Sequence, residues 1–371
     1  MNMKVNRYNY PSQFGDELQS LLNVIGDDLV NGHYILTEAV ESFETAFANY
    51  IGATCCVGTN SGTDALILAL LALGIGPGDE VITQANTFYA TVAAICFVGA
   101  TPILVDAEPH AYLMDVGQVE PAITARTKAI IAVHLFGKCM PMTRLLALAE
   151  KYQLRVIEDA AQSHGARIDG RAAGHFGDIG CYSFHPSKNL AAAGDAGAIV
   201  TDDRHLAEQI KILRALGQSG QNRHVALGMN SKLDAIQARV LSAKLGRLDH
   251  WNDQRRAVAA HYISRLDGLP LSFQAPAEHQ DHVYHLFQVR TEQRDALLAH
   301  LQSSGIDAVI RYPTPIHVQE AFAAFGWTAG DFPVAQALAA QTLCLPLRPD
   351  MNIDEVDLVC DCVRAFFRER S

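Results

Sequence analysis

Short apolar runs alternate with longer helical patterns through the middle of the chain. The runs lie at residues 56–58, 81–83, 103–106, 129–133, 156–159, 180–184 and 198–201. Continuous apolar runs of this length are typical of parallel strands that helices cover on both faces. The pattern therefore predicts an α/β domain with a doubly wound, mostly parallel sheet.

Helical patterns flank this central region, and a second kind of pattern follows it. Apolar residues at helical spacing cover residues 12–50 and 236–265. The tail combines a strand pattern at 284–289 with helical patterns at 294–303 and 353–367. We therefore predict an N-terminal helical segment (1–30), a large α/β domain (31–250) and a smaller C-terminal α+β domain (251–371).

Charge and hydropathy narrow the class of protein. The 371 residues contain 49% apolar side chains and carry a formal net charge of −11. This excess of negative charge argues against binding to nucleic acid and to an anionic membrane surface. No apolar run approaches the roughly 18 residues that a membrane span needs, and the segment after Met1 has no hydrophobic signal region. We expect a cytoplasmic protein that acts on small molecules.

Cysteines and histidines do not indicate a metal site. The eight cysteines are scattered, with no C-x-x-C pair, so they predict neither a zinc site nor a disulfide framework. They are more typical of small core residues in a reducing compartment. His134, His164, His175 and His185 lack the spacing of helical metal-ligand motifs, so we expect solvated or hydrogen-bonded side chains.

A lysine and an aspartate follow two of the predicted strands. Residues 181–190 end an apolar strand and open a loop that contains Lys188. Lysine is costly to bury, so Lys188 is either a solvated loop residue or a chemically used one. The strand at 156–159 ends in Asp159. Such a pair holds pyridoxal phosphate (PLP), with the lysine as Schiff base and the aspartate at the pyridinium nitrogen. Both would lie at the carboxyl edge of the sheet, where open α/β sheets bind ligands.

A glycine-containing loop joins the first predicted strand to its helix. Its sequence is Thr59-Asn60-Ser61-Gly62-Thr63-Asp64. The free N–H groups of a first helical turn, together with the helix dipole, favour an anion at such a position. The loop lacks the P-loop lysine and the spacing of a dinucleotide fingerprint. It predicts either a phosphate site of another kind or an ordinary helix N-cap.

Taken together, these motifs resemble those of the DegT–DnrJ family of PLP-dependent sugar aminotransferases. The resemblance runs from about residue 10 to the C-terminus and rests on several motifs in the same order. They are Asn60-Ser61-Gly62-Thr63-Asp64-Ala65-Leu66, Asn86-Thr87-Phe88, Glu158-Asp159-Ala160-Ala161-Gln162, Ser183-Phe184-His185-Pro186-Ser187-Lys188-Asn189-Leu190 and Met229-Asn230-Ser231-Lys232-Leu233-Asp234. The resemblance implies a fold type I PLP-dependent transferase whose substrates are a nucleotide-linked sugar and an amino acid.

The resemblance also implies roles around the cofactor ring. Lys188 would form the Schiff base and then carry the proton between the substrate carbon and the cofactor. Asp159 would keep the pyridine nitrogen protonated. Gln162 would reach the 3′-oxygen of the cofactor, and Phe88 would stack on its ring. The competing interpretations are a helix N-cap for Asp159, a solvated helix residue for Gln162 and an ordinary core aromatic for Phe88.

Four further residues would hold the cofactor phosphate. By the resemblance, Gly62 and Thr63 would supply backbone N–H groups and Ser183 its hydroxyl. Asn230 would reach the same phosphate from the neighbouring subunit. The resemblance therefore implies a homodimer with shared active sites.

The substrate pocket departs from the family pattern. The resemblance places His185 in the pocket beside the catalytic lysine. Where many relatives have His-Tyr-Pro, this chain has Arg311-Tyr312-Pro313. An arginine at the pocket edge can bind a phosphate or a carboxylate more firmly than a histidine. We therefore expect Arg311 and Tyr312 to help select the substrate.

The stretch after Lys188 bears on which carbon is aminated. Residues 189–197 resemble the version found in relatives that act at C-3 of the hexose, whereas relatives acting at C-4 more often carry threonine-rich stretches. We expect transfer, with glutamate as donor, to C-3 of a nucleotide-linked deoxyhexose. The alternatives are a C-4 keto-sugar aminotransferase, a ketocyclitol aminotransferase, a sugar dehydratase, which Lys188 disfavours, and a non-catalytic regulator.

Overall fold

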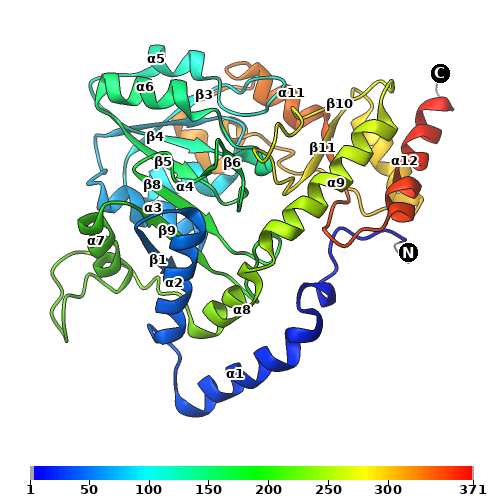
Figure 1. Ribbon diagram of the computed structural model, residues 1–371. Coiled ribbons are helices and arrows are strands. Elements are labelled where there is room, and N and C mark those ends of the chain that lie inside the picture. The colour runs from blue at the N-terminus through cyan, green and yellow to red at the C-terminus, as the bar shows by residue number, and fades with distance from the viewer. Residues whose placement is uncertain (1–3, 370–371) are drawn as a thin grey trace.

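The computed structural model describes residues 4–369, and its elements form two unequal parts (Figure 1). The larger part has a seven-stranded sheet of β1 (Cys55–Thr59), β2 (Glu80–Gln84), β3 (Thr101–Val105), β4 (Thr127–Val133), β5 (Arg155–Asp159), β8 (Ile179–Ser183) and β9 (Gly197–Thr201). The strand order is β1-β9-β8-β5-β4-β2-β3. The smaller part has an antiparallel sheet of β10 (Ser272–Phe273), β11 (Phe287–Arg290) and β12 (Thr342–Leu345). A short hairpin joins β6 (Arg167–Ile168) to β7 (Arg171–Ala172).

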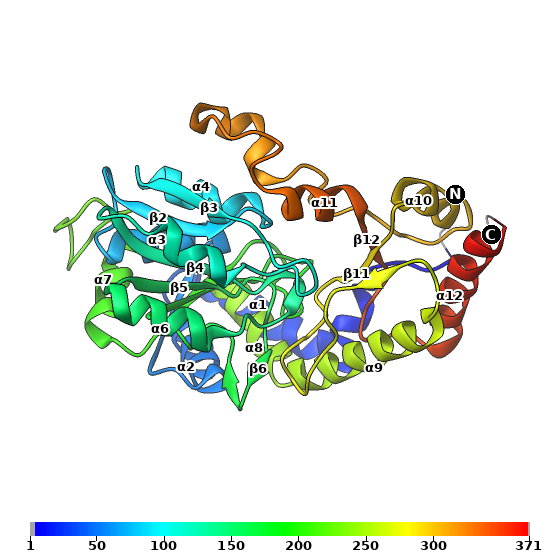
Figure 2. The ribbon, with the colours of Figure 1, turned by 90° about the horizontal axis from the view of Figure 1, so that it is seen from above.

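Helices connect and cover these strands. In the first half they are α1 (Leu18–Asn31), α2 (Glu38–Ile51), α3 (Gly62–Ala72), α4 (Tyr89–Phe97), α5 (Val119–Ala122) and α6 (Met142–Tyr152). In the second half they are α7 (Arg204–Arg214), α8 (Ala235–Leu245), α9 (Leu248–Leu266), α10 (Arg294–Ser303), α11 (Pro333–Gln341) and α12 (Ile353–Arg368). Figure 2 shows the two parts side by side, with α9 running from one toward the other. No helix within residues 4–369 is long and apolar enough to cross a bilayer.

The predicted α/β class with a mostly parallel sheet is confirmed, with one strand corrected. β2, β3, β4, β5 and β8 pair in parallel. The prediction that residues 198–201 form another parallel strand was wrong, because β9 runs antiparallel to both β8 and β1. A parallel crossover usually needs a helix, and the connection from β8 to β9 contains none. The chain therefore turns back directly, and the loop of the turn carries Lys188.

The central strands are buried on both faces, as their continuous apolar pattern indicates. In β8, Cys181 belongs to the core that contains the α3 side chains, whereas Tyr182 faces the core that contains α2 and α8. The ring of Tyr182 meets that of Phe47 edge to face, with the ring centroids 4.9 Å apart. This packing on both sides holds the end of β8, and with it the lysine loop, in place.

The C-terminal part has a separate hydrophobic core. It is formed by α9, α10, α12, β11 and β12, together with Val5 from the N-terminal segment, which pairs with Ile306. The helical pattern at 236–265 proves to be two helices, α8 and α9, because the helix is interrupted at Gly246. Three elements of this part, β10, α11 and β12, were not predicted from the sequence.

Candidate active site

A cavity of about 310 Å³ opens beside the carboxyl ends of β5 and β8. Among the residues that line it are ten of the eleven predicted site residues: Gly62, Thr63, Phe88, Asp159, Gln162, Ser183, His185, Lys188, Arg311 and Tyr312. A larger groove of about 750 Å³ lies between α2 and α7, but none of the predicted residues lines it. The predicted site residues therefore come together around the smaller cavity.

Lys188 lies in the loop that follows β8. Its backbone N–H donates to the carbonyl of His185 over 2.8 Å, and Ala192 donates to the carbonyl of Phe184 over 2.7 Å, so the loop is tightly folded. Burial lowers the pKa of the Lys188 amine to about 8, helped by the positive charge of Arg311 and opposed by Asp159. The neutral fraction of this amine at neutral pH is thus far larger than that of an ordinary lysine, and only the neutral form acts as a nucleophile or base.

Asp159 ends β5 and is 7% exposed. Its Oδ2 accepts a hydrogen bond from Thr91 over 2.8 Å, and its Oδ1 accepts one from the N–H of Ala161 over 3.2 Å. Burial raises the pKa of this carboxyl group, and the two hydrogen bonds and the charge of Lys188 oppose the shift. No helix begins at Ala160, so the N-cap interpretation of Asp159 does not hold.

Gln162 is fixed by two hydrogen bonds at the cavity wall. Its Oε1 accepts from the N–H of Phe136 over 2.6 Å, and its Nε2 donates to the hydroxyl of Tyr312 over 2.9 Å. It is 5% exposed and lies in a turn, which excludes a solvated helix residue. Phe88 is 47% exposed, and its ring centroid lies 5.7 Å from that of Tyr312. Gln162 and Phe88 both contact Tyr312, and all three residues line the cavity.

The N-terminus of α3 forms another wall. The side chain of Ser61 caps this helix by accepting from the N–H of Asp64 over 3.1 Å. Gly62 lies so close to β8 that a Cβ at this position would stand 2.6 Å from the Cβ of Ser183. The absence of a side chain therefore brings the first turn of α3 against Ser183. Backbone N–H groups and a hydroxyl converge there, as an anion site requires.

Asn230 is the one predicted site residue that does not line the cavity of its own chain. It is exposed, and its side-chain oxygen accepts a hydrogen bond from Lys232. The next residue, Ser231, donates to Oδ2 of Asp64 over 2.7 Å, which ties this segment to the first turn of α3.

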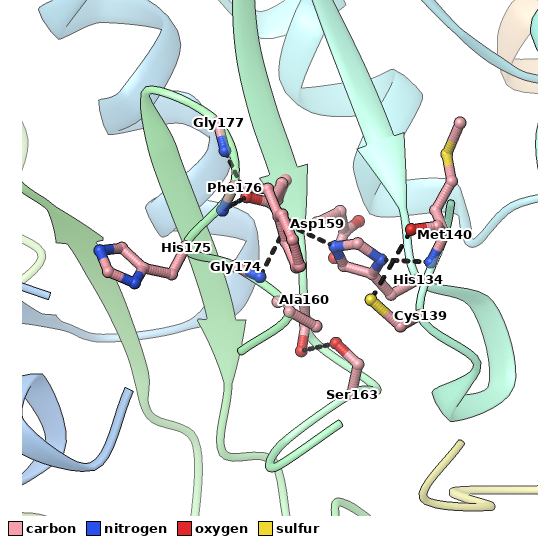
Figure 3. A network of polar contacts seen from close by, with 12 residues as sticks. His134, Cys139, Met140, Asp159, Ala160, Ser163, Gly174, His175, Phe176 and Gly177 are labelled. Atoms are coloured by element: carbon pink, nitrogen blue, oxygen red, sulfur yellow. Dashed lines mark hydrogen bonds and ion pairs between the residues drawn. The ribbon is translucent and has the colours of Figure 1, made fainter. Parts of the chain in front are cut away.

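A buried polar network lies behind Asp159 and was missed by the sequence analysis (Figure 3). Glu158 accepts hydrogen bonds from the N–H groups of Gly174, Phe176 and Gly177, at 2.8, 2.5 and 2.6 Å. It also lies 2.8 Å from Nε2 of His134, and both side chains are fully buried. Consecutive strand residues point to opposite faces, so Glu158 secures the far side of the strand whose end carries Asp159.

The hydrogen-bond pattern assigns the proton of His134. The N–H of Met140 donates to Nδ1 over 2.9 Å, so Nδ1 acts as an acceptor and Nε2 carries the hydrogen that meets Glu158. His175 lies 3.0 Å from Asp202, whereas the ring nitrogens of His164 have no hydrogen-bond partner within residues 4–369. No group of metal-ligating side chains occurs in that range.

Two further residues at the site were not singled out from the sequence. Thr91, on α4, donates to Asp159. His285, which precedes β11, is 7% exposed and lines the cavity. Neither lies in a distinctive motif, and both reach the site through tertiary packing that no short-range pattern reveals.

Comparisons with known proteins place this geometry in a family. Residues 17–364 match the DegT/DnrJ/EryC1/StrS aminotransferase family. The chain is 44% identical over 337 residues to the dTDP-3-amino-3,4,6-trideoxy-alpha-D-glucose transaminase of Streptomyces venezuelae, covering 91% of this chain and 89% of that protein. It is also 44% identical over 354 residues to the UDP-N-acetyl-3-dehydro-alpha-D-glucosamine 3-aminotransferase of Acidithiobacillus ferrooxidans, covering 95% of each.

Solved structures agree with the sequence relatives. The structure of S. venezuelae DesV in complex with a ketimine intermediate matches with a TM-score of 0.95 and 41% identity, covering 99% of each chain. Other related structures contain the cofactor as PMP or as PLP. The predicted enzyme class and cofactor are confirmed. The chain therefore belongs to the DegT/DnrJ/EryC1/StrS aminotransferase family of PLP-dependent sugar aminotransferases.

Proposed function

We propose that the protein transfers an amino group from glutamate to the C-3 keto carbon of a nucleotide-linked deoxyhexose. The observation that carries this proposal is the position of Asp159 at the end of β5 and of Lys188 in the loop after the paired strand β8, with both residues lining one cavity. The names of the two sequence relatives described above, both of which refer to amination at C-3 of a nucleotide sugar, support the choice of substrate.

The residues of the cavity fit PLP. We assign the phosphate to the first turn of α3, where Gly62 and Thr63 present N–H groups beside Ser183. We assign the pyridine nitrogen to Asp159, whose buried carboxylate is held from behind by Thr91 and Ala161. When bound, PLP supplies an electron sink for the carbon that bears the transferred nitrogen.

The chain's own groups then perform distinct tasks. Lys188 would hold the cofactor covalently in the resting enzyme, and its free Nζ would carry the proton to and from the reacting carbon. Asp159 keeps a proton on the ring nitrogen. Gln162, which Phe136 and Tyr312 hold in place, would reach the cofactor's 3′-oxygen, and Phe88 would cover the ring face.

His185, Arg311 and Tyr312 border the part of the cavity that we assign to substrates. Asp195, from the stretch that suggested amination at C-3, also lines the cavity, whereas Ala191 and Ala192 are buried behind it. The buried side chains of Ala191 and Ala192 thus affect the shape of the cavity only through their packing. Asp195, in contrast, faces the substrate directly. Together these residues set which keto carbon approaches the cofactor.

We further propose a cytoplasmic homodimer with shared active sites. All eight cysteines are free, which suits a reducing compartment. Large apolar side chains are exposed on α1 and on the segment before Asn230, among them Val30 at 87% and Leu227 at 97%. A second subunit would cover such side chains. It would also bring a second copy of Asn230 toward the phosphate site. The division into segments 1–30, 31–250 and 251–371 remains our proposal for the domains, supported by the separate C-terminal core.

Cofactor spectroscopy tests whether the protein is a working aminotransferase. The protein is loaded with PLP, glutamate is added, and the visible absorbance of the cofactor is followed together with the release of 2-oxoglutarate. We expect loss of the PLP band and stoichiometric keto acid, with neither change in Lys188→Ala. A wild-type protein that binds PLP but leaves its band unchanged with glutamate and other amino acids would favour a non-catalytic role.

A further inference from the structure

One wall of the cavity comes from the C-terminal part of the chain. It carries His285 and Arg311, and each of these side chains has one buried nitrogen without a hydrogen-bond partner within residues 4–369. His285 precedes β11, and Arg311 follows Val309, which pairs with Cys344 on β12. Since β11 and β12 are paired, His285 and Arg311 approach the cavity from neighbouring chain segments. The cofactor phosphate is assigned to other residues of the cavity, those of the first turn of α3.

His285 carries a buried imidazole and is one of the residues that line the cavity. It is 7% exposed, and its Nδ1 has no hydrogen-bond partner within residues 4–369. Burial holds its pKa well below the usual range, and the nearby charges of Lys188, Arg255 and Arg311 add to the shift. The ring is therefore neutral, with one N–H to donate. An unpaired polar group in so dry a position is costly unless a ligand satisfies it.

Arg311 is a cation without a counterion. It donates from Nη2 to the hydroxyl of Tyr8 over 3.1 Å, and its buried Nε has no partner in the described part of the chain. No carboxylate within residues 4–369 forms an ion pair with it. The carboxylates that line the cavity are Asp159, already held by two hydrogen bonds, and the exposed Asp195. The charge of Arg311 thus remains available for an anionic ligand.

The chemistry of the two substrates decides which anion reaches this wall. Arg311 is close enough to Lys188 to lower the pKa of its amine. In an amino acid the carboxylate is bonded to the very carbon that carries the amine, so it must lie beside the reacting centre. In a 3-keto nucleotide sugar the diphosphate is attached at C-1, further from the reacting carbon. The donor carboxylate therefore suits the position of Arg311 better than the diphosphate does.

We propose that His285 and Arg311 together bind the α-carboxylate of the amino donor, with the imidazole N–H and the guanidinium each donating to it. This inference rests on the proposed function and adds a donor subsite to it. His285 then selects donors that carry an α-carboxylate, while the nucleotide sugar does not depend on His285.

Donor binding without turnover gives the most direct test. α-Methyl-L-glutamate has no α-hydrogen, so it can bind the PLP form without completing transamination, and the cofactor absorbance reports its dissociation constant. We expect His285→Leu to raise that constant by about 10- to 100-fold, the effect of one hydrogen bond to a charged group. His285→Gln, which keeps an N–H donor, should recover part of the loss. Circular dichroism checks folding, and His285→Gln is used for the comparison if His285→Leu does not fold.

Two controls separate donor binding from general damage. His317 is likewise buried but packs against Phe332, with the ring centroids 5.0 Å apart, and does not line the cavity, so His317→Leu should leave donor affinity unchanged. The PMP form of His285→Leu should keep its affinity for the nucleotide sugar within about threefold of wild type, which is below one hydrogen bond's effect.

Unchanged donor affinity in His285→Leu would overturn the inference. So would an equal loss for donor and sugar, or a loss for the sugar alone. These outcomes differ from failure of the proposed function, in which the wild-type protein itself transfers no amino group to any nucleotide sugar.

Discussion

Oγ1 of Thr91 lies 2.8 Å from Oδ2 of Asp159 and donates a hydrogen bond to it. The same hydroxyl lies 2.9 Å from that of Thr87, so a short chain of hydroxyl groups leads to the carboxylate. This contact opposes the effect of burial, which raises the pKa of Asp159. Thr91 therefore helps to keep the acid ionised, and an ionised acid is what a protonated pyridine nitrogen requires.

Replacing Thr91 with valine should make Asp159 harder to ionise. An acid is ionised above its pKa, so activity is lost as the pH falls through that value. Without the hydroxyl donor the pKa rises, and the acid limb of kcat/KM should move to higher pH by about one unit, given about 1.5 kcal/mol for such a bond. The measurement is a pH profile of kcat/KM for the two enzymes.

Thr91→Ser keeps the hydroxyl and serves as the matched control, with an acid limb close to that of wild type. If Thr91→Val and Thr91→Ser both retain the wild-type profile, the hydrogen bond does not tune Asp159.

The amine of Lys188 should govern covalent uptake of PLP by the apoprotein. Only the neutral amine attacks the cofactor aldehyde, and the neutral fraction increases as the pH rises through a pKa of about 8. The uptake rate should therefore increase with pH around that value. Stopped-flow absorbance measures it, and Lys188→Ala should show no covalent phase. A rate that is flat from pH 6 to about 9 would contradict a pKa lowered by burial.

The hydrogen bonds of Glu158 should matter for stability rather than for chemistry. Glu158→Gln replaces a fully buried acceptor of several hydrogen bonds with an amide that turns a donor toward one of them. The free energy of unfolding should fall by about 1–3 kcal/mol, measured by urea denaturation. Glu120→Gln, on the surface, should change it much less. If the two changes lower the free energy of unfolding equally, the buried hydrogen bonds of Glu158 stabilise the fold no more than a surface contact does.

Much of the site was predictable because its residues lie in local motifs. Strand ends, loops and helix starts are readable from apolar runs and glycines, and Lys188, Asp159 and Gly62 occupy such positions. Thr91 and His285 were missed because Thr91 contacts Asp159, and His285 lines the cavity, only through packing between elements distant in the sequence. The antiparallel direction of β9 was also missed, since an apolar run does not reveal strand direction. Its direction depends on the loop between β8 and β9, which contains no helix.

Shared sites can be tested by mixing two defective variants. Lys188→Ala lacks the amine that we assign to catalysis, and Asn230→Ala should retain PLP more weakly by about 1–3 kcal/mol. If Asn230 acts on the partner's site, a mixed dimer has one site with both defects and one intact site. Mixing after mild dissociation should therefore restore activity, as measured with limiting PLP. If sedimentation shows dimers with exchanged subunits but no activity returns, the sites are not shared.

Matched keto sugars test whether the protein transfers the amino group to C-3 of a nucleotide-linked deoxyhexose. The PMP-loaded protein is incubated with the 3-keto and the 4-keto forms of one nucleotide-linked 6-deoxyhexose and, separately, with a ketocyclitol. Return of the PLP absorbance gives the rate, and NMR of the product locates the new amine. We expect rapid conversion of the 3-keto sugar, with the amine at C-3. Conversion of the 4-keto sugar alone, or of the cyclitol alone, would contradict it.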